Sequence, residues 1–307
     1  MSLNFQPLPE TIHMLAIGST IGILGGGQLG RMMSMAASRL GYHVHIYSDE
    51  AEAPAAEVSR QVTLADYTDE TALRKFASEV DCVTLEFENI PVTSLRLLQS
   101  LVAVMPGPQV LDVTQHRLRE KEFIAQQAIA TAPFHPVMSL QDLREGLAML
   151  GTPAILKTAC MGYDGKGQFL ITNAVQAEEA WQALGEQPCV LEGFVEFTAE
   201  LSIIVARNRV GEMTVFPLTR NVHQHHILHE SYYPAQVEPE VALQAQEIAQ
   251  TLAIKCDLIG LLAVELFLCE NNQLIVNELA PRPHNSGHWT MDACATSQFE
   301  QAIRAVA

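Results

Sequence analysis

The chain has 307 residues, of which 48% are hydrophobic, so it is long enough for two or three lobes with buried cores. Its 35 acidic and 18 basic residues give a net charge of −17, which argues against nucleic acid or an anionic membrane surface as a partner. The six cysteines contain no Cys-x-x-Cys pair, and no apolar stretch is long enough to span a bilayer. We therefore expect a cytoplasmic protein with reduced thiols and no membrane contact.

Strand and helix patterns alternate from about residue 19 to residue 113. Strands are predicted at 21–24, 44–47 and 82–85, and helices at 31–40, 70–80 and 93–99. This alternation is typical of an α/β fold in which helices cover a parallel sheet. We predict an N-terminal extension at residues 1–18 and a Rossmann-like domain at residues 19–115.

The first glycine-rich loop, Gly25-Gly26-Gly27-Gln28-Leu29-Gly30, follows a predicted strand and opens a predicted helix. Backbone N–H groups at a helix N-terminus bind phosphate, so this pattern indicates a phosphate site without identifying the ligand. Asp49 and Glu50 end the next strand, where a dinucleotide fold places an acidic residue for the ribose. A nicotinamide-dependent oxidoreductase is therefore one alternative.

A second unit begins near residue 116, after which a charged helix is predicted at 115–128 and strand pairs from Pro153 onward. The glycine-rich segment 162–168 joins two predicted strands, and Gly167 rather than Ser or Thr follows Lys166, so it is not a Walker loop. It resembles a flap that closes over a triphosphate, with Lys157 on the preceding strand holding the phosphates. An ordinary long hairpin is the simpler alternative.

Two further segments are candidate parts of a nucleotide site. The strand 190–195 can offer backbone groups to an adenine edge, and Glu200 follows within reach of ribose hydroxyls. His223 belongs to a cluster with His225, His226 and His229, which suggests zinc; however, no cysteine lies nearby, and the spacing does not secure a convergent geometry. We therefore keep His223 as a candidate site residue and expect the other histidines on the surface.

An acidic hairpin follows near the end of the chain. The apolar runs on both sides of Asn271-Asn272 predict two antiparallel strands with a two-residue turn. Counting outward from that turn places Glu265 opposite Glu278, with Cβ atoms roughly 4.5–5.5 Å apart. Carboxylates at that distance repel unless a cation lies between them, and Mg²⁺ binds one or two carboxylates together with substrate phosphates. The hairpin predicts a metal site; solvated surface glutamates are the alternative.

The segment from Asn277 to Trp289, together with three other motifs, carries a resemblance to a known family. The other motifs are Gly-Gly-Gly-Gln-Leu-Gly-Arg-Met at 25–32, Glu-Phe-Glu-Asn-Ile-Pro at 86–91 and the glycine-rich segment 162–168. From about residue 19 to residue 307, the chain resembles the ATP-grasp ligases and, among them, the 5-(carboxyamino)imidazole ribonucleotide synthases. The His-Asn-Ser-Gly-His run at 284–288 is specific, because related ligases carry different residues there.

The resemblance implies an ATP-grasp architecture and a reaction of de novo purine biosynthesis. A small lobe with the flap would occupy residues 116–197 and a core lobe residues 198–307, while the family's usual small C-terminal domain is absent from this chain. ATP, bicarbonate and 5-aminoimidazole ribonucleotide would react through carboxyphosphate to give 5-carboxyaminoimidazole ribonucleotide, ADP and phosphate. The family also implies a homodimer and two Mg²⁺ ions, with Mn²⁺ as a substitute.

The same resemblance assigns roles to individual residues. It gives the metal to Glu265 and Glu278, and the reacting groups to Lys157, Arg282, His284 and Asn285. The implied ATP contacts are Arg117, Lys121, Lys157, Gly162, Tyr163, Asp164, Gly165, Lys166, Gly167, Gln168, Glu192, Gly193, Phe194, Val195, Glu200, His223, Asn277 and Glu278. The implied contacts of the imidazole substrate are Gln28, Leu29, Glu88, Tyr163, Asp164, Arg282, His284, Asn285 and Ser286.

The chain departs from the family pattern in two places. Ala159-Cys160 stands where many members have basic residues, so one phosphate or flap contact is expected to be missing. The family's C-terminal domain supplies a Lys and an Arg to the substrate's phosphate. An inactive nucleotide-binding relative is therefore a second alternative to the ligase.

Overall fold

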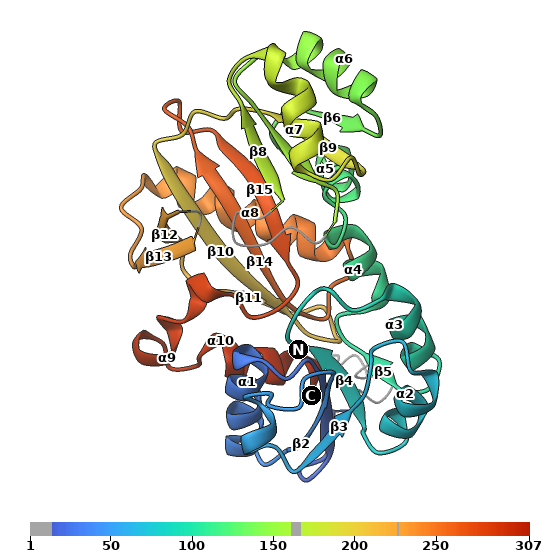
Figure 1. Cartoon of the computed structure of the whole chain (residues 1–307). Coiled ribbons are helices and arrows are strands. Elements are labelled where there is room, and N and C mark those ends of the chain that lie inside the picture. Colours follow the sequence, from blue (N-terminus) through green and yellow to red (C-terminus); the bar gives the residue numbers. More distant parts are fainter. Residues whose placement is uncertain (1–13, 161–166, 226) are drawn as a thin grey trace, which may run out of the picture.

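The computed structural model describes residues 14–160, 167–225 and 227–307, and within them the strands form three sheets (Figure 1). The N-terminal domain lies at one end of the molecule and a small antiparallel sheet at the other, with a large antiparallel sheet between them. The fold class is α/β, as predicted, and the first sheet is parallel, as predicted. This arrangement leaves one face of the large sheet open toward the other two lobes.

The N-terminal sheet has the order β3-β2-β1-β4-β5, with every pairing parallel. Its strands are β1 (Thr20–Leu24), β2 (His43–Ser48), β3 (Gln61–Leu64), β4 (Cys82–Leu85) and β5 (Ala103–Val104). The helical segments beside it are α1 (Gln28–Arg39), η1 (Ala56–Val58), α2 (Glu70–Ala77) and α3 (Val92–Gln99). The sequence did not predict β3 or β5, because β3 is an edge strand without a buried stripe and β5 has only two residues.

Two helices connect this domain to the rest of the chain, α4 (Pro108–Thr114) and α5 (Arg117–Gln126). The prediction of one helix over 115–128 was wrong at its start. The chain turns at Gln115, whose side-chain amide donates hydrogen bonds to the carbonyls of Glu88 and Ile90 in the N-terminal domain. α5 therefore begins at Arg117, and its first turn faces the core lobe.

The small sheet has the order β6-β9-β7-β8 and is antiparallel throughout. Its strands are β6 (Phe134–Val137), β7 (Ala154–Thr158), β8 (Gln168–Ile171) and β9 (Cys189–Gly193). The helical segments α6 (Leu140–Leu150), η2 (Ala174–Gln176) and α7 (Ala177–Ala183) cover one face, where Leu147 and Trp181 join a core with Leu156. Because side chains alternate along a strand, Lys157 of β7 and Glu192 of β9 lie on the opposite face.

The large sheet has the order β13-β12-β10-β14-β15, and β11 also pairs with β10. Its strands are β10 (Ala199–Arg207), β11 (Met213–Val215), β12 (Thr219–Gln224), β13 (Ile227–Tyr232), β14 (Gly260–Leu268) and β15 (Leu274–Ala280). Helix α8 (Pro239–Lys255) packs on one face, where Leu262, Val264 and Leu266 of β14 join its core. Glu265 and Phe267 alternate with them and therefore point to the open face.

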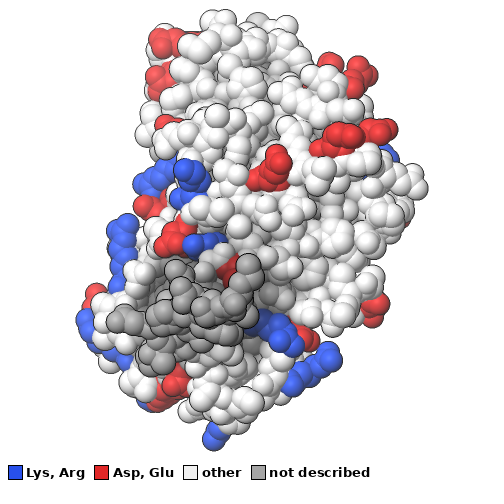
Figure 2. Space-filling model, turned by 180° about the vertical axis from the view of Figure 1, so that it is seen from behind, with Lys and Arg blue, Asp and Glu red and all other residues white. Residues whose placement is uncertain are grey.

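The end of the chain returns to the N-terminal domain through η3 (Asn285–Gly287), α9 (Thr290–Ala293) and α10 (Gln298–Val306). Helix α10 lies against both α1 and β14, and Phe299 and Ile303 share a core with Met33. Among the described residues, none of the helices is both long and apolar enough to cross a membrane. On the face shown in Figure 2, basic and acidic side chains lie interspersed among wide uncharged areas.

The loop of the β14–β15 hairpin differs from the prediction. The N–H of Cys269 donates to the carbonyl of Gln273 at 3.0 Å, so the loop contains three residues, 270–272, rather than two. The last of them, Asn272, has a φ of 61°, a left-handed conformation that asparagine adopts more readily than most residues. The predicted two-residue turn at Asn271-Asn272 was therefore wrong, and the strands next to the loop pair one residue out of the predicted register.

A β-bulge at Asn277 then restores the register. Leu266 pairs with Val276 on one side of the bulge and Glu265 with Glu278 on the other, so β15 has one more residue than β14 between these pairs. The extra residue compensates for the longer loop, and the predicted opposition of the two glutamates is confirmed. A bulge also turns side chains out of strict alternation, which brings Asn277 and Glu278 to the same open face of the sheet.

Candidate active site

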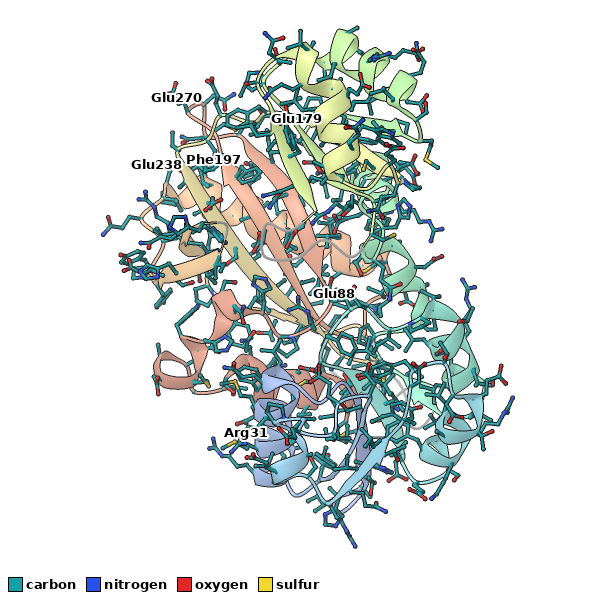
Figure 3. All side chains as sticks on the ribbon, in the orientation of Figure 1. Arg31, Glu88, Glu179, Phe197, Glu238 and Glu270 are labelled. Atoms are coloured by element: carbon teal, nitrogen blue, oxygen red, sulfur yellow. The ribbon has the colours of Figure 1, made fainter. Side chains whose placement is uncertain are left out.

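A cleft of about 690 Å³ lies where the N-terminal domain, the small sheet and the large sheet meet. Many of the predicted site residues line it: Leu29, Glu88, Arg117, Lys157, Gln168, Phe194, Glu200, His223, Glu265, Asn277, Glu278, Arg282, His284 and Asn285. Figure 3 shows Glu88 between the N-terminal domain and the large sheet. The fold thus brings together residues from all three lobes, as a site between lobes requires.

Other predicted residues lie beside the cleft or outside the described parts of the chain. Lys121 and Glu192 are buried, as is Ser286, whereas Gln28 is exposed at the start of α1. Gly167, Gly193 and Val195 neighbour the lining residues Gln168 and Phe194 in the sequence without lining the cleft themselves. The predicted flap residues Gly162, Tyr163, Asp164, Gly165 and Lys166, and also His226, lie outside the described residues.

Lys121, Lys157 and Glu192 form a buried ion cluster. Glu192 Oε2 lies 2.9 Å from Lys157 Nζ, and Glu192 Oε1 lies 3.3 Å from Lys121 Nζ. Burial disfavours the charged form of each group, and it lowers the pKa of Lys121. The pKa of Glu192 nevertheless falls below its usual value, because the two lysines outweigh burial. Two cations against one anion leave positive charge at Lys157, the member that lines the cleft. Such a group suits a bound phosphate.

Glu265 and Glu278 face each other in the cleft. Glu265 accepts a hydrogen bond from the Asn277 amide at 3.3 Å, and Glu278 lies 3.5 Å from the Arg117 guanidinium. Burial, followed by the charge of Glu278, raises the pKa of Glu265 to about 8, so the pair resists full ionisation unless a cation joins it. Burial alone would raise the pKa of Glu278, but Arg117, His284, Lys157 and Arg282 together keep it below its usual value. Two carboxylates with a neighbouring amide are oxygen donors that fit a hard divalent cation such as Mg²⁺.

The outer edge of β15 carries an isolated backbone bridge between Val276 and Thr131, and side chains complete the rest of it. Glu120 Oε1 accepts the N–H of Leu279 at 2.8 Å, and Lys121 Nζ donates to the carbonyl of Asn277 at 3.4 Å. Thr131 Oγ1 donates to the carbonyl of Val276 at 3.1 Å. Helix α5 therefore holds the bulged part of β15 in place. Glu120 was not predicted as a site residue, because a single glutamate on a charged helix carries no distinguishing pattern.

A carboxyl group occupies the N-terminus of α1, and this bears on the dinucleotide alternative. Glu86 is buried, and its two oxygens accept the N–H groups of Gly27 at 2.7 Å and of Gly30 at 3.1 Å. A dinucleotide pyrophosphate would require these same donors and would meet the Glu86 side chain. Among the described residues, Glu86 accepts the N–H groups of Gly27 and Gly30 but not those of Gln28 and Leu29.

Comparison with known proteins agrees with this arrangement of lobes. The family described as "Ribonucleotide synthetase preATP-grasp domain" matches residues 18–115, and the family described as "ATP-grasp domain" matches residues 122–299. The N5-carboxyaminoimidazole ribonucleotide synthase of Brucella melitensis is 46% identical over 94% of this chain and 81% of that protein. The synthase of Bacillus subtilis is 45% identical over 94% of this chain and 76% of that protein.

The chain belongs to the N5-carboxyaminoimidazole ribonucleotide synthase family. A crystal structure of an ADP complex from this synthase family matches with a TM-score of 0.93 and 42% identity over 96% of this chain and 78% of that one. A synthase from Aspergillus clavatus, in complex with ADP and 5-aminoimidazole ribonucleotide, matches with a TM-score of 0.88 and 30% identity over 94% and 76% of the two chains. A bifunctional purine synthesis protein of Dictyostelium discoideum is 48% identical, and the chain spans 30% of its length.

The apolar part of the cleft was not predicted as a binding surface of the synthase. Ile155, Phe197 and Phe267 line it together with the predicted Phe194. Phe197 and Phe267 stack with ring centroids 4.5 Å apart and 9° between their planes. Figure 3 shows Phe197 near the end of the large sheet away from the N-terminal domain. Phe267 could have been found from sequence, because it stands two residues beyond Glu265 on the same face of β14.

His223 lies on β12 and His229 on β13, and His225 lies in the turn that follows β12. His223 Nδ1 is hydrogen-bonded to Glu200 across β10 and β12, and this bond raises the pKa of His223. His229 is exposed beside Glu230. Within the described residues, no group of three or more His, Cys, Asp or Glu side chains could hold a metal ion. His223 thus faces the cleft of the synthase as a partner of Glu200.

The loop after β15 places Arg282 and His284 at the N-terminal side of the cleft. Arg282 Nε lies 2.7 Å from Glu88 Oε1, and His284 Nε2 lies 3.5 Å from Glu265 Oε1. Burial, followed by the charge of Arg282, lowers the pKa of His284 to about 4, so its ring is neutral at pH 7. A neutral ring with one N–H and a guanidinium beside it can orient an anionic or polar substrate.

Proposed function

We propose that this protein carboxylates 5-aminoimidazole ribonucleotide with bicarbonate at the expense of ATP, in de novo purine biosynthesis. The products would be 5-carboxyaminoimidazole ribonucleotide, ADP and phosphate. The main support is one cleft that combines the Lys157 cluster, the opposed pair Glu265 and Glu278 and the Arg282–His284 loop. A relative that carries ADP and the aminoimidazole ribonucleotide shares this fold.

The nucleotide would occupy the part of the cleft between the small and large sheets. Its adenine would pack among Phe194, Phe197 and Ile155, and Glu200 with His223 would bind the ribose. Lys157 would bind the phosphates, because its neighbours leave it with an excess of positive charge. Gln168 lines the same region.

Glu265 and Glu278 would hold Mg²⁺, with Asn277 as a neighbouring oxygen donor. A bound divalent cation neutralises charge on the phosphate oxygens, which is the chemistry that phosphoryl transfer requires. Arg117 would support this region by holding Glu278 in its ionised form.

The imidazole substrate would occupy the end of the cleft beside the N-terminal domain. The N–H groups of Gln28 and Leu29 would receive its phosphate, and Glu88, His284 and Asn285 would orient the ring. A bicarbonate oxygen attacks the γ-phosphorus and ADP leaves, giving carboxyphosphate. The substrate amine then attacks the carboxyl carbon, phosphate leaves and the nitrogen loses a proton. A closed cleft protects carboxyphosphate from water.

We also propose that the protein is a cytoplasmic homodimer, as the family resemblance implies. Light scattering of the purified protein tests the dimer, for which the mass would be twice 33.7 kDa.

The activity is tested by measuring phosphate release and carbon transfer in the same reaction. With ATP, Mg²⁺ and ¹³C-bicarbonate, the aminoimidazole ribonucleotide should stimulate phosphate release, and a ¹³C carbamate signal should appear. Lys157→Met should abolish both, whereas the control Lys75→Met, at an exposed position of α2, should abolish neither. A rate of phosphate release that does not change when the aminoimidazole ribonucleotide is added would contradict the proposal.

A further inference from the structure

Gln298, the first residue of α10, makes two hydrogen bonds to the backbone of His284. Its side chain is fully buried. Gln298 Oε1 accepts the N–H of His284 at 2.9 Å, and Gln298 Nε2 donates to the carbonyl of the same residue at 2.7 Å. One amide thus satisfies both backbone groups of His284, in the way that a neighbouring strand would.

The surroundings of Gln298 are built to hold this amide. Its own N–H donates to Thr290 Oγ1 at 2.9 Å, and that hydroxyl donates to the carbonyl of Gly287 at 2.6 Å. A Cβ at Gly287 would stand 2.4 Å from Gln298 Oε1 and 2.5 Å from Ile204 Cδ1, so a side chain at residue 287 would displace the amide. Glycine is therefore required there by space.

The backbone position of His284 decides where its ring nitrogens point. Nδ1 accepts the N–H of Ser286 at 3.3 Å and lies 2.9 Å from Ser286 Oγ, which can donate to it. The tautomer with its proton on Nε2, toward the Glu265 carboxylate, therefore satisfies both ring nitrogens. Nε2 faces the cleft, 3.5 Å from Glu265 Oε1. A backbone shift at His284 would break the Ser286 contact and change both the position and the tautomer of the ring.

The helix that carries Gln298 also contacts the N-terminal domain. Phe299 and Ile303 pack in one core with Met33 of α1, directly after the loop that is proposed to receive the substrate's phosphate. The N-terminal domain, which is proposed to bind the substrate's phosphate, therefore fixes the position of Gln298. The Gln298 amide in turn holds His284, which is proposed to face the imidazole ring.

We propose that Gln298 is a positioning residue that sets the place and tautomer of His284 for the imidazole substrate. This inference rests on the proposed function for its substrate. Gln298→Met keeps the length of the side chain and removes both hydrogen bonds. Because a displacement of about 1 Å can cost roughly 10²-fold in rate, kcat/KM for the aminoimidazole ribonucleotide should fall by about that factor. The dissociation constant of ADP should change less than about twofold.

The matched control is Gln301→Met, one turn along the same helix at a half-buried position. Gln298→Glu retains an acceptor for the His284 N–H and should recover part of kcat/KM. Nitrogen NMR of the His284 ring provides a readout that does not need the substrate: wild type should show one tautomer, and Gln298→Met a mixture. An unchanged tautomer, or an equal loss of ADP affinity, would overturn the positioning role. If the wild-type protein shows a single tautomer but does not carboxylate the aminoimidazole ribonucleotide, the proposed function is refuted instead.

Discussion

Glu192→Gln tests the buried ion cluster, because it removes one charge and keeps the shape of the side chain. Glu192 is 4% exposed and lies between Lys157 Nζ at 2.9 Å and Lys121 Nζ at 3.3 Å. Without the carboxylate, two ammonium groups would remain buried side by side. Removing one partner of a buried ion pair costs about 3–5 kcal/mol. We expect the free energy of unfolding to fall by that amount at pH 7.

The effect should depend on pH in a defined direction. Burial alone would raise the pKa of Glu192, but Lys157 and Lys121 hold it below the ordinary value of 4.5. A carboxyl with a lowered folded-state pKa contributes stability that is present above its unfolded pKa and is lost as the pH falls through the folded value. The difference between wild type and Glu192→Gln should therefore be full above pH 4.5 and shrink below it.

Urea denaturation followed by circular dichroism measures this free energy. The control is Glu196→Gln, at an exposed position a few residues further along, which should change stability by less than about 0.5 kcal/mol. If Glu192→Gln also fell within that margin at pH 7, the cluster would contribute nothing as a charged unit, and our account of the excess positive charge at Lys157 would be refuted.

Further substitutions test other parts of the cleft. Glu278→Gln should abolish ATP turnover with the fold intact; near-normal turnover at ordinary Mg²⁺ concentrations would refute the metal assignment. Glu120→Leu should destabilise the protein by about 1–3 kcal/mol, because it leaves the buried N–H of Leu279 without its acceptor, as measured by urea denaturation. Gly27→Val should weaken binding of the aminoimidazole ribonucleotide and spare ATP in calorimetry, because its Cβ would stand 2.7 Å from Glu86 Oε1. Tight NADH binding to wild type that this change abolishes would favour the oxidoreductase.

The parallel sheet was predictable because its strands are buried on both faces. The apolar composition of runs such as residues 21–24 and 82–85 predicts buried strands, and both strands are present in the structure. Polar edge strands escape this signal: β3 has no buried residue, so nothing in its sequence separates it from a loop. Helix α10 is amphipathic, and such a helix repeats its apolar positions along the sequence.

The supporting residues of the site were not predictable in the same way. Gln298 opens α10 and Glu120 lies within α5, and each holds the backbone of a segment far away in the sequence. A hydrogen bond from a side chain to a distant backbone group leaves no periodic pattern. Glu86 was part of a recognised motif, but its contact with Gly27 depends on two strand ends meeting, which only the folded sheet shows.

Side chains of α5 hold the bulge of β15 in position. A bulge leaves backbone groups of an edge strand without ladder partners, and such groups are costly when buried. Here the side chains of Glu120 and Lys121 bind the N–H of Leu279 and the carbonyl of Asn277, so the bulge is satisfied from α5. Lys121 also belongs to the ion cluster at Lys157. The proposed metal pair and the proposed phosphate lysine are therefore held by one helix, and a shift of α5 would displace both together.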